Sequence, residues 1–205
     1  MAAELDRPEL ELAGELELAL DLADRADAIT LPHFRADDLQ VEHKADRTEV
    51  TVADRGTEAA IRARLAVARP DHAVLGEEEG LIGSATARAR WIIDPIDGTS
   101  NFVKGVPIWA TLIALEVDGE LVVGVASAPA LGRRWWGARG IGAFADGQPI
   151  HVSSVSSLSE AHLGYSDVGS FYEHGCGDAL VALTRKAWRA RGLGDFWMHM
   201  LVAEG

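Results

Sequence analysis

The sequence predicts an α+β fold in which helices and strands form separate layers. Two helical patterns come first, a series of short strands follows, and mixed helical and strand patterns complete the chain. This order favours layered packing with mostly antiparallel strand pairing. The chain has 205 residues, of which 48% are apolar, and a chain of this size can bury a large core.

The two helices at the start are predicted from hydrophobic periodicity. The first is expected over residues 8–34, because its apolar residues recur at helical spacing with acidic residues opposite. These apolar residues are Leu12, Leu16, Ala19, Leu20, Ala23 and Ala26. The second helix is expected to follow residues 48–54 and to end near Ala68, with Ile61 and Leu65 on its inner side. Both apolar faces are expected to meet the core.

Short strands are predicted after Pro70, over residues 73–75, 91–93, 109–117, 121–128 and 133–138. Asp118-Gly119 is a hairpin signal, because both residues tolerate the positive φ of a tight turn. Further on we expect a strand near residue 163 and helices over residues 178–188 and 195–203.

The serine-rich residues 153–160 predict a boundary between two halves. Residues 1–152 are expected to form an N-terminal α+β half that holds two helices, a sheet and the functional site. Residues 153–205 are expected to begin an incomplete C-terminal α/β half.

Charge and composition exclude several classes of function. Asp and Glu total 32 against 19 Lys and Arg, a net charge of -13, which argues against a basic nucleic-acid-binding surface. No apolar run approaches the ~20 residues of a membrane span, and residues 1–11 lack a signal peptide's basic start. Cys176 is the only cysteine, so no intramolecular disulfide can form. We therefore expect a cytoplasmic protein without nucleic-acid or membrane partners.

Acidic side chains follow two of the predicted strands. Residues 77–79 are all glutamate, and Asp94 and Asp97 follow the strand over residues 91–93. Carboxylates at strand ends can converge in a crevice, where they would repel one another unless a cation lay among them. These donors are hard oxygens with no His or Cys cluster nearby, which favours Mg²⁺ over zinc. Pro95 restricts the backbone, so the two carboxylates and an intervening carbonyl could face one point.

Directly behind these acids, Gly98-Thr99-Ser100-Asn101 indicates a turn that leads into the start of a helix. Free backbone N–H groups at such a start attract phosphate oxygens. Asp-Pro and Asp-Gly are also common turn elements, and acids after a strand often simply meet solvent. Either piece alone favours that plainer interpretation. Together they favour Mg²⁺-dependent hydrolysis of a phosphate monoester.

These segments resemble the signature of the inositol monophosphatase family. The central part is Gly-Glu-Glu at residues 76–78 followed by WIIDPIDGTSNF at residues 91–102. Residues 48–54 resemble the acidic segment at the start of that family's second helix, and residues 139–144 resemble its glycine-rich strand and turn. Residues 195–205 resemble the helix before its last strands. The resemblance covers nearly the whole chain and implies a layered α-β-α-β-α sandwich.

The resemblance also implies roles for individual residues. It implies four Mg²⁺ ligands, which are Glu77, Asp94, the carbonyl of Ile96 and Asp97. Thr99, paired with Asp54, would orient and help to deprotonate the attacking water, and Glu77 would belong to the same catalytic set. The N–H groups of Gly98 and Thr99 would hold the phosphate, with Asp97 beside them in the substrate-binding set.

Residues outside this centre indicate the substrate. Residues 102–109, 133–136 and 194–196 are similar to the histidinol-phosphate phosphatase branch of the family. The resemblance implies that Arg191 and Asp195 contact the alcohol part of the substrate. The charge of Asp195 suits the cationic amine of histidinol, although Asp195 could also cap the helix that follows.

The function expected is a Mg²⁺-dependent histidinol-phosphate phosphatase of histidine biosynthesis that acts on a small phosphorylated alcohol. Two alternatives stay open. One is the same chemistry on inositol 1-phosphate or another small phosphate ester, and the other is a truncated relative without catalysis. The resemblance also implies a homodimer.

One part of the family pattern does not occur in these residues. Family members continue through a Trp-Asp motif whose aspartate completes the metal site, and the 205 residues contain no Trp-Asp pair. We therefore expect the second half to be truncated relative to the family fold. A second metal is expected to bind more weakly, with reduced activity of this polypeptide.

Overall fold

The computed structural model describes residues 7–44 and 48–205, with the backbone alone for residues 7–11. Residues 1–6, on which part of the signal-peptide prediction rests, lie outside the described residues. The chain divides into two units, Met1–Pro149 and Ile150–Gly205, so the division falls three residues before the boundary expected from the sequence.

The first unit is built on an eight-stranded sheet with the order β10-β9-β8-β7-β6-β5-β3-β4. Its strands are β3 (Ala73–Gly76), β4 (Gly80–Ile82), β5 (Ala89–Asp97), β6 (Ala110–Val117), β7 (Glu120–Ala128), β8 (Arg133–Ala138), β9 (Gly142–Ala145) and β10 (Gln148–Pro149). All neighbours pair antiparallel except β3 and β5, which are parallel. A short 3₁₀ helix, Pro129–Leu131, precedes β8.

The predicted hairpin between β6 and β7 is present. Asp118 and Gly119 form its turn with φ values of 53° and 83°. Both values lie in the left-handed region that aspartate and glycine tolerate best.

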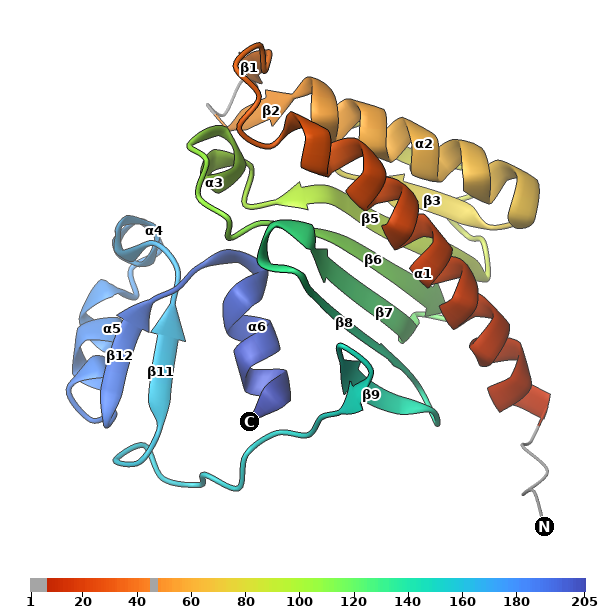
Figure 1. Ribbon diagram of the computed structural model, residues 1–205. Coiled ribbons are helices and arrows are strands. Elements are labelled where there is room, and N and C mark those ends of the chain that lie inside the picture. Colours follow the sequence, from red (N-terminus) through yellow and green to blue (C-terminus); the bar gives the residue numbers. More distant parts are fainter. Residues whose placement is uncertain (1–6, 45–47) are drawn as a thin grey trace. The chain divides into compact units, whose positions relative to one another are not determined.

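Two long helices pack against this sheet, α1 (Arg7–His33) and α2 (Val52–Ala68) (Figure 1). Helix α1 crosses β6, β7 and β8, while α2 lies beside α1 and against β5. The core between them contains fully buried side chains from both helices and from the sheet, such as Leu22, Ile61, Leu65, Trp91 and Ile113. Burial of these apolar side chains is the main force that holds the layers together. The core-facing helices predicted from periodicity are therefore confirmed.

Two short strands lead into the second helix. Strands β1 (Val41–His43) and β2 (Glu49–Thr51) pair antiparallel. Thr51 is the N-cap of α2, and it exchanges hydrogen bonds with Asp54 in a capping box. This local arrangement fixes Asp54 at the first turn of the helix, where its side chain is fully buried.

The second unit contains a parallel strand pair and three helices. Its strands are β11 (His162–Tyr165) and β12 (Arg189–Gly192), and its helices are α4 (Val168–Glu173), α5 (Gly177–Thr184) and α6 (Asp195–Glu204). Helix α6 packs close to β11, because a Cβ on Gly164 would lie 1.8 Å from the end of the Met198 side chain. Among the described residues, no helix is long and apolar enough to cross a bilayer.

The helix predicted over residues 178–188 was wrong in its last turn. Helix α5 ends at Thr184, and the chain then enters β12. The apolar residues up to Trp188 fit a helical spacing locally. The parallel pairing of Arg189 with His162 across the unit overrides that local preference.

Candidate metal and phosphate site

The acidic ends of two strands lie side by side in the sheet. Strands β3 and β5 are parallel, with Gly76 opposite Ile93. The carboxyl ends of parallel strands meet at the same edge, so Glu77 follows β3 next to Asp94 of β5. The amide of Glu77 donates to the carbonyl of Ile93 at 3.2 Å. The fold thus brings together the two acidic segments singled out in the sequence.

A bulge in β5 sets the direction of its two aspartates. Between Asp94 and Asp97 the register with β6 shifts, so that Pro95 and Ile96 oppose Thr111 alone. Residues three apart in a regular strand point to opposite faces, and one extra residue brings them to the same side. The buried Thr111 hydroxyl donates to the carbonyl of Pro95 at 2.8 Å. The bulge therefore lets Asp94 and Asp97 act on a common region.

Asp94 occupies a largely buried and strongly negative position. Burial, followed by the charges of Glu77 and Asp97, raises the pKa of Asp94 to about 8. The carboxyl of Glu77 lies next to it, and a proton or another cation between the two groups would relieve their repulsion. Asp94 Oδ1 also accepts from the amide of Ile96 at 3.1 Å. A donor set of carboxylate oxygens with excess negative charge fits Mg²⁺.

Lys44 neutralises part of this charge. Its Nζ donates to Glu77 Oε1 at 2.9 Å and to Glu78 Oε1 at 2.8 Å. Burial opposes the charge of Lys44, but the hydrogen bonds to Glu78 and Glu77 outweigh it and raise the pKa of Lys44. Among the described side chains, those of residues 12–44 and 48–205, no three Asp, Glu, His or Cys groups enclose a metal position as they stand. Because Lys44 already binds Glu77, a cation at Glu77 would compete with Lys44.

The Thr99 hydroxyl lies between a carboxylate and a carbonyl. Thr99 Oγ1 is 3.3 Å from Asp54 Oδ1 and 2.9 Å from the carbonyl oxygen of Ile96. Its one proton is shared between these acceptors, so a proton directed at Asp54 leaves the Ile96 carbonyl open to another partner. Asp54 also accepts from the amide and hydroxyl of Thr51 at 2.7 and 2.6 Å. Burial nevertheless raises the pKa of Asp54.

A short helix begins directly behind these residues. Gly98, with a φ of 85°, turns the chain from β5 into α3 (Thr99–Val103). A left-handed conformation of this kind favours glycine. Phe102 anchors the helix, since its ring packs edge-on against Trp109 with centroids 4.9 Å apart. The N–H groups at the start of this helix lack intrahelical acceptors.

The two residues expected to contact the alcohol lie in the second unit. Arg191 belongs to β12, is exposed, and donates to the carbonyl of Ala190 at 2.9 Å. Asp195 is exposed and is the first residue of α6, with a φ of 58°. The N-cap of that helix is Gly194, so Asp195 does not occupy the capping position.

Comparisons with known proteins identify the family of this chain. A profile of the inositol monophosphatase family matches residues 12–205. The histidinol-phosphatase of Streptomyces coelicolor is 51% identical over 200 residues, which cover 93% of this chain and 74% of that protein. The histidinol-phosphatase of Mycobacterium tuberculosis is 53% identical, with coverage of 93% and 75%.

The chain belongs to the inositol monophosphatase family. An inositol monophosphatase from Zymomonas mobilis, 33% identical, superposes with a TM-score of 0.80 over 94% of this chain and 74% of that one. The family and the fold predicted from the sequence are therefore confirmed, and so is the predicted class of enzyme, a phosphoric monoester hydrolase. The family acts on small phosphorylated molecules and depends on metal.

Sequence reasoning missed three residues around the acids of this family member. Lys44 contacts Glu77 across 33 positions of the chain, and no local pattern linked the two. Glu58 and Arg62 form a buried pair that contacts the turn after β3. Their spacing of four on a predicted helix was a usable signal, because such residues are neighbours on the helix surface.

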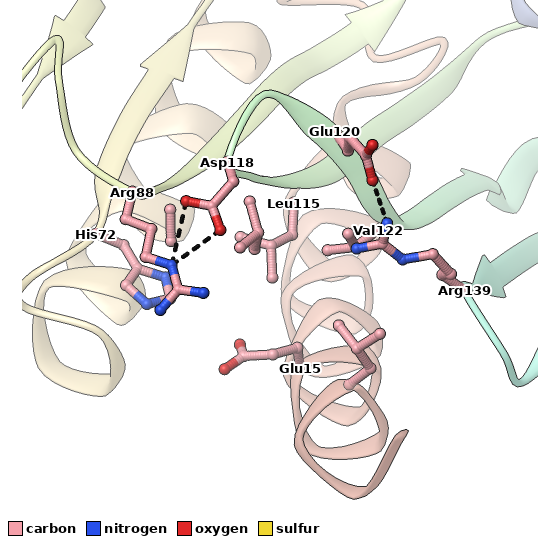
Figure 2. Close-up of a pocket in the computed structure, with 11 residues that line it drawn as sticks. Glu15, His72, Arg88, Leu115, Asp118, Glu120, Val122 and Arg139 are labelled. Atoms are coloured by element: carbon pink, nitrogen blue, oxygen red, sulfur yellow. Dashed lines mark hydrogen bonds and ion pairs between the residues drawn. The ribbon is translucent and has the colours of Figure 1, made fainter. Parts of the chain in front are cut away.

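The same sheet has a hollow at its opposite end. It has a volume of about 660 Å³ and is lined by residues of α1 and of the β6–β7 hairpin, together with His72, residues 88–89 and Arg139 (Figure 2). Its acids each have an arginine partner: Asp118 with Arg88, Glu120 with Arg139, and Glu15 with Arg69. The inositol monophosphatase signature lies at the other end of β5, so this hollow is separate from the candidate site.

Proposed function

We propose that this chain is a Mg²⁺-dependent phosphatase of histidinol phosphate. The observation that carries the chemistry is the Thr99 hydroxyl, 3.3 Å from the buried carboxylate of Asp54, beside the edge where Glu77 and Asp94 meet. The substrate rests on identities of 51% and 53% with two relatives named histidinol-phosphatase. The proposal includes a role in histidine biosynthesis, a cytoplasmic location and a homodimer.

The proposed Mg²⁺ ligands are Glu77, Asp94, the carbonyl of Ile96 and Asp97. Two observations support them, namely the charge of Glu77 beside Asp94, which helps to raise the pKa of Asp94, and the bulge between Asp94 and Asp97. Mg²⁺ bound there would lower the pKa of a water molecule and stabilise the entering and leaving oxygens of an in-line displacement.

Asp54 and Thr99 form the proposed proton relay, with Glu77 in the same catalytic set. A threonine hydroxyl alone is a poor base, so Thr99 would take a proton from water while it passes its own to Asp54 Oδ1. Burial raises the pKa of Asp54, which makes this carboxylate a stronger proton acceptor than an exposed one. The N–H groups of Gly98 and Thr99, with Asp97 alongside, would orient the phosphate.

Arg191 and Asp195 are the proposed contacts to the alcohol part of the substrate. Asp195 offers a negative charge to the amine of histidinol, whereas a neutral polyol has no group that needs this charge. Asp195 is an exposed residue, although partial burial raises the pKa of its carboxyl. The N-cap of α6 is Gly194, so a contact with substrate would not displace the capping residue.

Phosphate release measured on two substrates tests the proposal. With Mg²⁺ present, we expect kcat/KM to be higher for histidinol phosphate than for inositol 1-phosphate. Asp195→Asn should lower kcat/KM for histidinol phosphate by about 10-fold, the size of a lost charged hydrogen bond, and leave inositol 1-phosphate unaffected. Equal or reversed preference of the wild-type protein would reject the substrate. Absence of release from both esters would favour a non-catalytic relative.

A further inference from the structure

A carboxylate of helix α2 accepts hydrogen bonds from the backbone of the turn after β3. Glu58 is fully buried. Its Oε2 accepts from the amide of Glu78 at 2.8 Å, and its Oε1 accepts from the amide of Glu79 at 3.0 Å. A carboxylate that accepts two successive amides fixes the path of the backbone between them. The three consecutive glutamates therefore sit on a defined turn.

Arg62, one helical turn further along α2, completes this support. Its Nε and its terminal amino group lie 2.9 and 2.8 Å from Glu58 Oε1. The same guanidinium donates to the carbonyl of Val74 at 3.3 Å and to that of Gly80 at 2.5 Å. It thereby ties together the strands on both sides of the turn. The pairing also balances the buried charge of Glu58.

Gly76 leaves the space that the carboxylate occupies. A Cβ at this position would lie 2.2 Å from Glu58 Oε1 and 2.3 Å from its carboxyl carbon. The φ of Gly76 lies outside the left-handed region, so the backbone there does not itself call for glycine. The reason for glycine at this position is the close approach of Glu58.

The support acts on one glutamate in particular. The side chain of Glu78 is buried against Lys44, and that of Glu79 lies 3.7 Å from Arg62. The amide of Glu77 donates to the carbonyl of Ile93, and its carboxyl accepts from Lys44. With the next two amides held by Glu58, the position of Glu77 follows from the turn.

We propose that Glu58, Arg62 and Gly76, here called the Glu58 clamp, are positioning residues that hold Glu77 in place as a Mg²⁺ ligand. This inference rests on the proposed Mg²⁺ site. Both oxygens of Glu58 are already engaged by the turn and by Arg62, so Glu58 acts through Glu77. A ligand held in advance loses less side-chain freedom when the ion binds, and this raises affinity.

Titration calorimetry with MgCl₂ on the metal-free protein tests the clamp. We expect Glu58→Gln and Gly76→Ala each to raise the dissociation constant for Mg²⁺ by about 10- to 100-fold, the usual effect of losing a group that orients a metal ligand. At saturating Mg²⁺, kcat should change far less than the affinity, because the bound ion then holds Glu77 in place. The double variant should be no worse than Gly76→Ala alone, since the added Cβ already displaces the side chain that Glu58→Gln alters.

Two matched controls separate positioning from plain stability. Asp27→Asn breaks another partly buried carboxylate–arginine pair, with Arg134 at 2.6 Å, and it should lower the melting temperature without changing Mg²⁺ affinity. Gly124→Ala adds a Cβ that meets nothing within 4 Å, and it should change neither quantity. Arg62→Lys keeps the positive charge but loses some of the hydrogen bonds that the guanidinium donates. We expect its Mg²⁺ affinity to lie between those of the wild type and Glu58→Gln.

The outcomes distinguish the clamp from the function it serves. If Glu58→Gln and Gly76→Ala melt earlier but bind Mg²⁺ as tightly as the wild type, the clamp is purely structural and the inference is overturned. If Glu58→Gln does not fold, the affinities of Gly76→Ala and Arg62→Lys decide in the same way. If the wild-type protein itself binds no Mg²⁺, both the proposed function and the proposed role of the clamp are rejected.

Discussion

The two ends of the sheet in the first unit differ in the burial and the pairing of their acidic side chains. Where β3 and β5 end, Asp94 is largely buried beside Glu77 and Asp97, and its pKa rises to about 8. At the other end, about 25 Å away along β5, the acids of the β6–β7 hairpin are exposed and paired: Asp118 with Arg88 and Glu120 with Arg139 (Figure 2). Of these two ends, the one where a cation is proposed to bind has the buried acids with excess negative charge.

The largest expected difference between the two ends comes from neutralising one acid at each of them. Asp94→Asn should abolish Mg²⁺ binding and phosphate release, because an amide replaces a charged ligand. Asp118→Asn, the control, should leave both unchanged, since its partner Arg88 is exposed. Calorimetry with Mg²⁺ and a phosphate-release assay measure the two effects. Mg²⁺ binding that persists in Asp94→Asn would exclude the proposed centre.

Removal of the Thr99 hydroxyl separates the effect on the chemical step from the effect on metal binding. Thr99→Ala should lower kcat by about 10²- to 10⁴-fold, the usual contribution of a positioned proton acceptor, while Mg²⁺ affinity changes far less. Thr99→Ser keeps the hydroxyl and should retain most activity. Steady-state kinetics at saturating Mg²⁺ gives the comparison. Normal turnover in Thr99→Ala would mean that Thr99 does not activate the water.

The pH dependence of stability should differ between wild type and Asp94→Asn in the absence of metal. The pKa of Asp94 rises from 3.8 to about 8 on folding, so the folded state binds more protons than the unfolded state between these values. Stability is therefore lost as pH rises from about 4 to about 8. Asp94→Asn removes this loss and should melt several degrees higher at pH 9 but not at pH 4. If the melting temperatures of the two proteins differed by the same amount at every pH, the pKa of Asp94 would not be raised by folding.

The smallest effect is expected at the paired end of the sheet. Arg88→Ala removes an ion pair whose side chains are 80% and 60% exposed, and exposed pairs contribute little. We expect the melting temperature to fall by no more than about 2–4 °C, and to fall less at high salt because salt screens such charges. Thermal melts at two salt concentrations check this. A larger fall would show that the hairpin depends on its surface charges.

Much of the first unit could be predicted from sequence because its signals are local. Helices α1 and α2 follow from apolar residues at helical spacing, such as Leu16, Ala19 and Ala23, which are buried as expected. The hairpin at Asp118 follows from the turn chemistry of two residues. Signals of this kind involve neighbours in the chain, so they can be read without knowledge of the fold.

In the second unit the strand near residue 163 and the helix from Asp195 are present as predicted, and the prediction failed at β12 for the opposite reason. Its strand β12 forms because Arg189 and the residues after it pair with β11, which lies more than twenty positions earlier. The local pattern up to Trp188 favoured a continued helix instead. Strand formation depends on a partner that sequence periodicity does not reveal.

The residue types in the sequence are sufficient to predict the chemistry proposed for the site. Acids at the ends of two apolar strands, with Gly98 and Thr99 behind them, predicted hard-oxygen ligands and a phosphate-binding turn. The tertiary structure alone decided which acids meet, through the parallel pairing of β3 with β5, the bulge opposite Thr111, and the contact of Glu58 with the turn. Residue type is a local property, whereas convergence depends on contacts across 20 to 45 positions of the chain.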